Sequence, residues 1–264
     1  MTDLARFEAF AVELARAAGA VALPLFRTDC GHENKAAGSG YDPVTEAGRG
    51  SEAAIRKLIA ERFPEHGVIG EEYGEDRPDA EFVWVLDPID GTRAFVAGLP
   101  LWTTLIALRR EGRPVVGVIS QPVLDEVFVG TASGSRLIAR GAECALKVRS
   151  CPKLTDAVIA TTDPDMFDGA ELGAWTQVRA AARLARLGCD AYAYAMLALG
   201  RIDLVIEAGL KAWDIEALVP VVEGAGGSVT NWRGQAVDGT GQIVAAGDPA
   251  ALEEALVALK RSAK

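Results

Sequence analysis

The chain has 264 residues, 50% of them hydrophobic, which is enough to bury a large core in one domain or two lobes. Its formal net charge of −10 argues against nucleic acid as a partner, because there is no basic excess to displace counterions from a phosphate backbone. The N-terminus lacks a basic stretch followed by an apolar core, and no apolar run reaches spanning length, so we expect a cytoplasmic protein with no membrane partner.

Cysteines and histidines limit the chemistry further. The cysteines form no Cys-x-x-Cys pair and have no histidine at zinc-binding spacing, so we expect reduced thiols at Cys30, Cys144, Cys151 and Cys189. Only two histidines are present, His32 and His66, and both are expected in loops. This disfavours catalysis by a histidine base.

The first half of the chain predicts helices followed by a sheet. Apolar residues at helical spacing predict a helix over residues 3–26, and a polar, Gly-rich stretch over 28–41 predicts a loop. A second helix is expected to begin near Ser51 and to end at Pro64. Tight turns then separate a series of short strands, which predicts a mainly antiparallel sheet with strands at 67–70, 82–87, 103–109, 114–120 and 125–130.

Beyond about residue 150 the pattern changes to alternating strands and helices, which is typical of α/β structure. The strands are expected at 156–161, 202–206, 228–231 and 242–246. The helices are expected at 170–186, 190–199, 214–224 and 248–261. We therefore predict two interlocked lobes, an α+β lobe over residues 1–150 and an α/β lobe over residues 151–264.

One strand runs directly into two carboxylates, in the segment Trp84-Val85-Leu86-Asp87-Pro88-Ile89-Asp90-Gly91-Thr92-Arg93. A desolvated carboxylate is costly unless something positive neutralises it, and Mg²⁺ prefers such oxygens. The amides of Gly91 and Thr92 would then open a helix whose positive end receives a phosphate. The alternative is a strand that ends in an Asx-rich turn.

Three further segments place carboxylates at the end of a strand, at the start of a helix or at the end of the predicted loop. They are Val68-Ile69-Gly70-Glu71-Glu72, Trp213-Asp214-Ile215-Glu216 and Tyr41-Asp42-Pro43-Val44-Thr45-Glu46. Each has a structural alternative, since Asp214 is a natural N-cap and Glu71 could lie in a solvated turn. Together they supply enough oxygen ligands for two or three Mg²⁺ ions, as two-metal phosphoryl transfer requires. Bound cations would also let an acidic chain hold a phosphate ester.

These motifs resemble the signature set of the inositol monophosphatase family: Gly70-Glu71-Glu72, then Asp87-Pro88-Ile89-Asp90-Gly91-Thr92, then Trp213-Asp214-Ile215-Glu216-Ala217. The resemblance covers nearly the whole chain. It implies a mixed α+β and α/β fold, a layered αβαβα sandwich, and a Mg²⁺-dependent phosphatase that acts on a small phosphate ester. It also implies a homodimer, with the region of Trp102 as a candidate contact. Gly48 departs from the family, which usually has Asp there, and we expect no loss of metal ligands from that change.

The resemblance assigns metal ligands by position. The first metal would be held by Glu71, Asp87 and the backbone carbonyl of Ile89. The second would be held by Asp87, Asp90 and Asp214. The loop carboxylate Asp42 matches the family residue used near a third metal.

The same resemblance suggests how hydrolysis proceeds. A water molecule activated by Mg²⁺ would be oriented by Thr92, with Asp42 or Glu71 taking its proton, and would attack phosphorus in line. The amides of Gly91 and Thr92 would hold the non-bridging phosphate oxygens.

Other segments resemble the histidinol-phosphate phosphatase branch of the family, among them Thr92-Arg93-Ala94-Phe95, Gly188-Cys189-Asp190-Ala191-Tyr192 and Ile206-Glu207-Ala208-Gly209. Histidinol phosphate carries an ammonium group and an imidazole, which Asp190 and Glu207 could bind. Arg93 is a further candidate for substrate contact. The alternatives are a helix cap for Asp190, a surface strand end for Glu207 and a structural ion pair for Arg93.

Rival functions stay open at this point. The chain could be an inositol-1-monophosphatase or a broad small-molecule phosphatase, and more remotely a relative acting on nucleotide bisphosphates or fructose 1,6-bisphosphate. A non-catalytic metal-binding scaffold is the alternative from a different class of protein.

Overall fold

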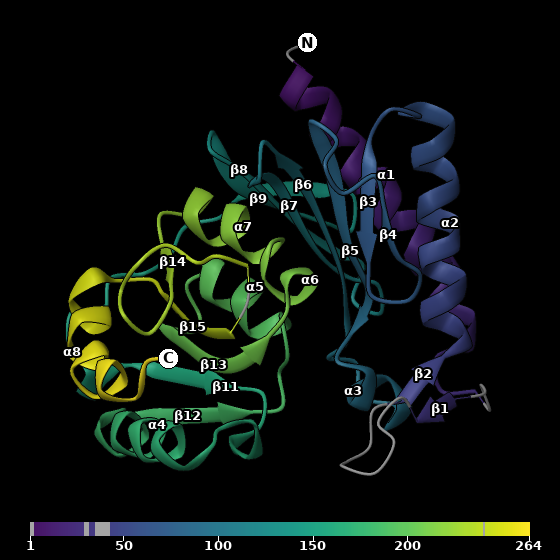
Figure 1. Ribbon diagram of the computed structural model, residues 1–264. Helices are drawn as coiled ribbons and strands as arrows, with labels where there is room; N and C mark the ends of the chain where they lie inside the picture. The colour runs from purple at the N-terminus through teal and green to yellow at the C-terminus, as the bar shows by residue number, and fades with distance from the viewer. Residues whose placement is uncertain (1–2, 29–31, 35–42, 240) are drawn as a thin grey trace.

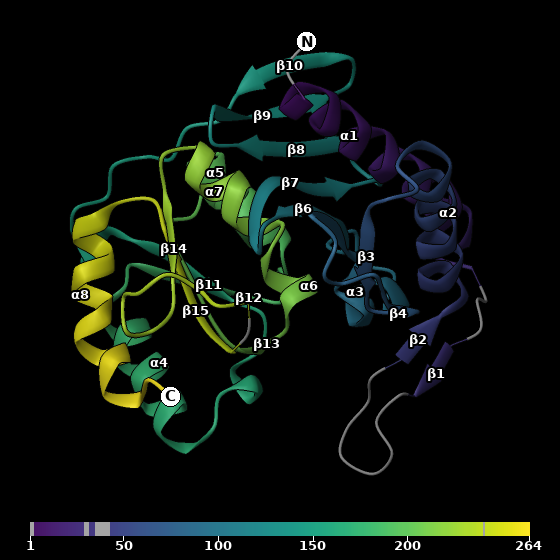
Figure 2. The same cartoon turned by 45° about the horizontal axis from the view of Figure 1, so that its top comes forward.

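The computed structural model describes residues 3–28, 32–34, 43–239 and 241–264. Its elements stack in five layers in the order αβαβα, which confirms the predicted sandwich (Figures 1 and 2). The outer helices α1 (Asp3–Ala22) and α2 (Glu46–Arg62) cover one face of a large sheet. The helices α5 (Tyr192–Ala198), α6 (Ala212–Ile215) and α7 (Leu218–Gly224) lie between the two sheets. The helices α4 (Gly169–Ala181) and α8 (Pro249–Leu259) cover the far face of the second sheet.

The large sheet has eight strands within the described residues, in the order β10-β9-β8-β7-β6-β5-β3-β4. It is mainly antiparallel as predicted, and only β3 and β5 run parallel. The strands are β3 (Gly67–Gly70), β4 (Gly74–Asp76), β5 (Phe82–Asp90), β6 (Thr103–Arg110), β7 (Arg113–Gln121), β8 (Glu126–Thr131), β9 (Gly134–Ala139) and β10 (Ala142–Ala145).

In the part of the chain that the structure describes, the second sheet has five strands in the order β12-β11-β13-β15-β14. The strands are β11 (Val158–Thr161), β12 (Leu184–Leu187), β13 (Leu204–Leu210), β14 (Ser228–Thr230) and β15 (Gly241–Ala246). Pairing is parallel from β12 through β11 to β13 and antiparallel from β13 through β15 to β14. All strands of the large sheet precede residue 150 and all strands of this sheet follow it, while the predicted lobe boundary itself stays a prediction.

Short elements complete the structure. The strands β1 (His32–Asn34) and β2 (Pro43–Thr45) pair with each other, and α3 (Thr92–Val96) follows β5 directly. Single 3-10 turns are η1 (Leu23–Leu25), η2 (Leu154–Asp156), η3 (Pro164–Met166) and η4 (Lys260–Ser262).

Alternate residues along β5 and β6 serve two different cores, which is why these strands are apolar on both faces. Trp84 and Ile106 pack with the helices α1 and α2. Val85 and Leu105 face α5 and α7, where they join residues of the second sheet in one cluster. Since every middle layer is buried on both sides, the chain needs the apolar content that its composition shows.

Three expectations about elements are wrong. The helix predicted over 170–186 ends at Ala181, because the next residues form the edge strand β12 against β11. The helix expected to begin near Ser51 begins at Glu46, where Ala47 and Gly48 are already buried. The predicted helix 214–224 is divided into α6 and α7, and Pro220 lacks the N–H that would bond back across the division.

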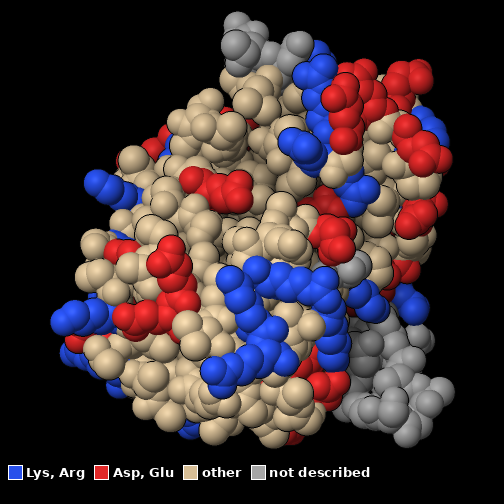
Figure 3. All heavy atoms as spheres, turned by 60° about the vertical axis from the view of Figure 1, so that its left-hand side comes forward, with Lys and Arg blue, Asp and Glu red and all other residues tan. Residues whose placement is uncertain are grey.

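The charged surface is not uniform. On the face shown in Figure 3, Lys and Arg side chains gather in one group in the lower middle, and acidic side chains form separate patches around it. The net charge of the chain is therefore a poor guide to the potential at any one site. Among the residues that the structure describes, no helix is both long and apolar enough to cross a bilayer.

Candidate active site

The end of β5 breaks its regular pairing with β6. The register shifts between Asp87 and Asp90, and the hydroxyl of Thr104 donates a hydrogen bond of 2.9 Å to the carbonyl of Pro88. In a regular strand, side chains three residues apart point to opposite faces, and a bulge re-aims one of them. This irregularity lets Asp87 and Asp90 contribute oxygens to a single cluster.

Asp214 completes that cluster from α6, in the helical layer between the two sheets. One carboxylate oxygen from each of Asp87, Asp90 and Asp214 lies within 4.8 Å of the others. Asp214 is the third residue of α6, so the N-cap is Lys211 and not Asp214, but its carboxylate accepts a hydrogen bond of 2.8 Å from the amide of Lys211 and thereby helps to cap the helix. The cluster thus joins the large sheet to a helix of the middle layer, 124 residues further along the chain.

The three aspartates oppose one another electrostatically. Burial raises the pKa of Asp87 well above its ordinary value, and the charges of Glu71, Asp90 and Asp214 raise it further. Burial also raises the pKa of Asp90, which its hydrogen bond from the amide of Ala191 partly offsets. For Asp214, burial raises the pKa to about 6. A cluster of oxygen donors in which one carboxylate is buried and two are half-buried fits a hard divalent cation such as Mg²⁺.

Glu71 joins the cluster from the turn after β3. Its carboxyl group shares a hydrogen bond with Asp87. The fully buried Glu52 of α2 holds this turn, because its carboxylate accepts hydrogen bonds from the amides of Glu72 at 2.8 Å and Tyr73 at 3.2 Å. The sequence interpretation missed Glu52, although its spacing places it on the same helix face as the buried Ile55.

The backbone after the aspartates turns sharply into α3. Gly91 precedes this helix with a φ of 76°, a left-handed conformation that favours glycine. A Cβ at this position would also lie 3.1 Å from Cγ of Asp190. The hydroxyl of Thr92 donates a hydrogen bond of 3.1 Å to the carbonyl of Ile89. Asp42, the remaining predicted catalytic residue, lies outside the described residues.

A small pocket of about 160 Å³ adjoins the aspartates and is lined by Asp90, Thr162, Met166, Asp190, Ala191, Tyr194, Glu207, Leu210 and Asp214. Glu207 is only 4% exposed, so the alternative of a surface strand end is wrong. Its carboxylate accepts hydrogen bonds from the amide of Thr162 at 3.1 Å and the hydroxyl of Tyr194 at 2.8 Å. Sequence reasoning missed Thr162, whose position directly after a predicted strand was an available signal.

Asp190 lies between this pocket and Gly91. Its side chain does not cap α5, since the N-cap is Ala191, so the capping alternative is wrong. Burial raises the pKa of Asp190 to about 6, the charge of Glu207 adds to the shift, and Arg93 opposes it. Arg93 itself donates a hydrogen bond of 3.1 Å to Asp163 at the exposed rim, which is the ion-pair alternative for that residue.

Trp102, His66 and the described cysteines lie outside the carboxylate cluster. Trp102 is fully buried in a small cluster with Phe95 and Ile89, so its own ring cannot form a dimer contact. His66 is buried just before β3 and accepts a hydrogen bond of 3.1 Å from the indole of Trp84, so it belongs to the core. The described cysteines, Cys144, Cys151 and Cys189, are free thiols, as expected.

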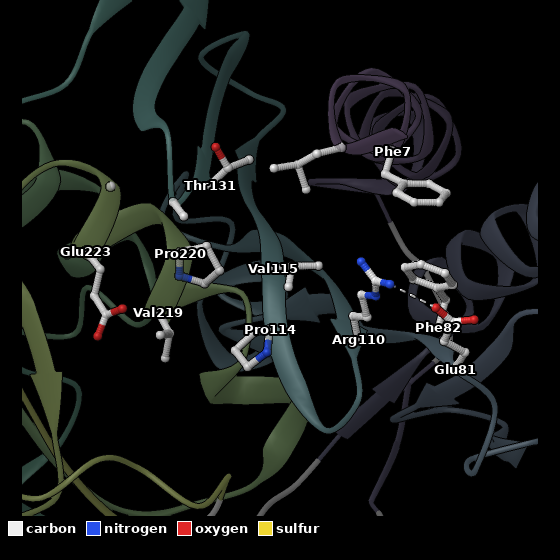
Figure 4. A pocket seen from close by; sticks show the side chains of 13 residues that line it. Phe7, Glu81, Phe82, Arg110, Pro114, Val115, Thr131, Val219, Pro220 and Glu223 are labelled. Carbon is white, nitrogen blue, oxygen red and sulfur yellow. Dashed lines mark ion pairs between the residues drawn. The ribbon is translucent and has the colours of Figure 1, made fainter. Parts of the chain in front are cut away.

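A larger groove of about 640 Å³ lies away from the carboxylates (Figure 4). Phe7, Phe82 and Arg110 lie towards one end of it and Pro220 and Glu223 of α7 towards the other, with Val115 of β7 between them. Its lining includes none of the clustered aspartates. Size alone would therefore point away from the residues that carry chemistry.

Known proteins resemble this chain over nearly its whole length. The model of the inositol monophosphatase family matches residues 3–264. The bifunctional phosphatase IMPL2 of Arabidopsis thaliana, a chloroplastic protein, is 42% identical over 98% of this chain and 76% of its own length. A histidinol-phosphatase of Chlorobaculum parvum is 34% identical over 89% of this chain and 90% of its own.

Solved structures show the same likeness. An inositol monophosphatase from Zymomonas mobilis superposes with a TM-score of 0.87, with 41% identity over 98% of this chain and all of the other. Both the sequence match and the fold likeness extend over nearly the whole of this chain. The chain belongs to the inositol monophosphatase family and is a phosphoric monoester hydrolase of that kind.

Proposed function

We propose that this phosphatase hydrolyses L-histidinol phosphate to L-histidinol and phosphate, as a step of histidine synthesis. The observation that carries the proposal is the small acidic pocket beside the aspartate cluster. It places Asp190 and the buried Glu207 next to Asp90 and Asp214. An alcohol that bears an ammonium group and an imidazole would pair with these carboxylates, whereas inositol offers only hydroxyl groups.

We assign the metal site to Glu71, Asp87, the carbonyl of Ile89, Asp90 and Asp214, with Mg²⁺ as the ion and two or three ions per site. Bound Mg²⁺ would supply a Lewis acid that offsets phosphate charge and makes water more acidic. The clustering of three carboxylate oxygens within 4.8 Å supports this assignment.

The remaining roles belong to the side chains of Thr92, Glu71 and Asp42 and to two backbone amides. The Thr92 hydroxyl donates its hydrogen bond to the carbonyl of Ile89. Its oxygen can therefore accept a hydrogen bond from an attacking water and orient it. Glu71 or Asp42 would take the proton of that water. We place the phosphate against the amides of Gly91 and Thr92, at the turn where β5 meets α3.

The decisive measurement compares kcat/KM for histidinol phosphate and inositol 1-phosphate at several Mg²⁺ concentrations. A preference of about 100-fold, roughly 2.7 kcal/mol of transition-state discrimination, would support the proposed substrate. The Asp190→Asn variant should then lose activity on histidinol phosphate while keeping most of its activity on inositol 1-phosphate. Equal or reversed rates in the unmodified enzyme would overturn the substrate assignment and leave the phosphatase chemistry standing.

An inositol-1-monophosphatase is the second candidate. It is favoured by the state of Glu207, whose carboxylate already accepts hydrogen bonds from Thr162 and Tyr194 and so needs no cation. The similar Zymomonas protein named above is an inositol monophosphatase. The same pair of substrates distinguishes the two candidates.

We further propose a cytoplasmic homodimer. Val96 and Leu99, which are close to the buried Trp102 in the chain, are 39% and 50% exposed, and exposed apolar side chains that form a patch are typical of an interface. Size-exclusion chromatography with light scattering would test the dimer by its mass. A Leu99→Ser variant whose mass shifts towards that of one chain would support a contact at Leu99.

A further inference from the structure

The segment that carries Asp214 sits directly on the large sheet. A Cβ at Gly117 of β7 would lie 2.2 Å from the carbonyl oxygen of Ala217, so backbone packs against backbone at this point. The same occurs at Gly130 of β8, where a Cβ would lie 2.3 Å from the carbonyl oxygen of Pro220. Both contacts anchor α7, which begins only after Asp214.

One ion pair anchors the part that lies nearer to Asp214. Arg109 of β6 donates from Nε to Glu216 at 3.0 Å and from Nη2 to the second carboxylate oxygen. The side chain of Glu216 is only 7% exposed, and the side chain of Arg109 is 21% exposed. A two-pronged pair of this kind fixes direction as well as distance. The two residues are 107 positions apart in the chain.

The placement of the pair gives it a role beyond cohesion. Arg109 pairs across the sheet with Val83, on the strand that ends in Asp87 and Asp90. Glu216 is two residues after Asp214. We infer that Arg109 is a positioning residue, whose ion pair with Glu216 holds the Asp214 segment in place against the strand that carries the other two aspartates. The inference rests on the proposed function only in taking these aspartates as metal ligands.

The chain offers a matched control in Arg149 and Asp203. This pair has the same two-pronged geometry, with Nε donating at 2.7 Å, and Asp203 is 1% exposed. Asp203 directly precedes β13, four residues before Glu207 and eleven before Asp214 in the chain. Loss of either arginine leaves a buried carboxylate without its cationic partner and lowers stability. Only the loss of Arg109 should disturb Asp214.

The first experiment measures amide hydrogen exchange over residues 211–217 in metal-free protein. Arg109→Met should speed exchange there on the order of tenfold relative to the unmodified chain, while Arg149→Met should leave it unchanged. If Arg109→Met does not fold, the double change Arg109→Met with Glu216→Gln removes the pair without leaving a buried charge. Unchanged exchange over 211–217 in the folded variant would overturn the inference.

The second readout is Mg²⁺ affinity by calorimetry. Arg109→Met should bind Mg²⁺ about tenfold more weakly or worse, as for other residues that orient metal ligands, and Arg149→Met should match the unmodified chain. Arg109→Lys should give an intermediate value because it keeps the charge and loses the second prong. Equal affinities in all variants would overturn the inference. If the unmodified chain binds no Mg²⁺, the metal assignment of the proposed function fails, and the exchange data still decide the role of Arg109.

Discussion

At the scale of single residues, the site depends on side chains that touch no substrate. Glu52 holds the turn that bears Glu71, through hydrogen bonds to the amides of Glu72 and Tyr73. This arrangement leaves no room beside it, since a Cβ at Gly70 would lie 2.0 Å from Oε1 of Glu52. A buried carboxylate whose hydrogen bonds are all made is held rigidly. Displacing it breaks these hydrogen bonds and leaves a buried charge uncompensated, which lowers stability.

We therefore expect Gly70→Ala to lower stability by roughly 1–3 kcal/mol and to weaken Mg²⁺ binding, because the turn carrying Glu71 must move. Gly173→Ala is the control, since nothing lies within 4 Å of a Cβ there and alanine favours a helix by about 1 kcal/mol. Urea unfolding and calorimetric Mg²⁺ titration measure the two effects. A Gly70→Ala protein with normal stability and affinity would show that Glu52 does not brace the turn.

His66 gives a pH dependence with a definite sign. Burial lowers its pKa, with help from the charge of Arg6, and its Nδ1 accepts the indole hydrogen of Trp84. The unfolded chain therefore takes up a proton at higher pH than the folded chain, and stability falls as pH drops below about 6.5. His66→Asn keeps an acceptor but cannot titrate.

The free energy of unfolding should thus decline more for the unmodified chain than for His66→Asn between about pH 7.5 and about pH 5.5. The comparison between the two proteins cancels the contributions of the other titrating groups. Parallel curves would mean that His66 does not report the proton uptake of unfolding.

At the scale of elements, most of the fold could be predicted from local pattern. The strands β5 and β3 can be predicted because their buried apolar runs stop at the charged residues Asp87 and Glu71. The edge strand β12 could not be recognised, since Leu184 and Leu187 are 51% and 39% exposed and the run reads equally well as helix. Its strand form depends on pairing with β11, a contact that local sequence does not encode.

The candidate site divides in the same way. Asp87, Asp90 and Asp214 could be proposed from motifs, because each stands at an element end. Their convergence required the bulge after Asp87 and the docking of α6, which are tertiary features. Glu52 and Thr162 were missed because one lies inside a helix and the other has a side chain common in loops.

Docking of α7 on the large sheet gives a prediction at this scale. Gly117→Ala should lower the free energy of unfolding by roughly 1–3 kcal/mol, because backbone atoms of Ala217 cannot be displaced by rotating a side chain. Gly112→Ala serves as the comparison, because nothing lies within 4 Å of a Cβ there. Its φ of 78° means that this change lowers stability through backbone strain alone. Urea unfolding gives both values. A loss at Gly117 no larger than that at Gly112 would mean that α7 does not rest on β7 as described.

At the scale of the whole molecule, the layers bring charge together at a cost to stability. Asp87 and Asp90 come from the second layer and Asp214 from the third, and each has a raised pKa. A carboxyl group whose folded pKa exceeds its unfolded value destabilises the fold at neutral pH. Stability is regained as pH falls through the folded pKa, about 6 for Asp214. A bound divalent cation would reverse the sign of this contribution.

Asp214→Asn should therefore melt at a higher temperature than the unmodified chain in EDTA at about pH 7.5, because one of three opposed charges is gone while an amide oxygen still accepts from Lys211. In saturating Mg²⁺ the order should reverse, since a ligand at about 100 times its Kd stabilises by roughly 2.7 kcal/mol and the variant has lost a ligand. Lowering the pH to about 5.5 in EDTA should narrow the first difference. Scanning calorimetry gives the melting temperatures of both proteins under the three conditions. A variant that melts lower in EDTA and responds normally to Mg²⁺ would show that Asp214 is a structural residue and that the cluster is not a cation site.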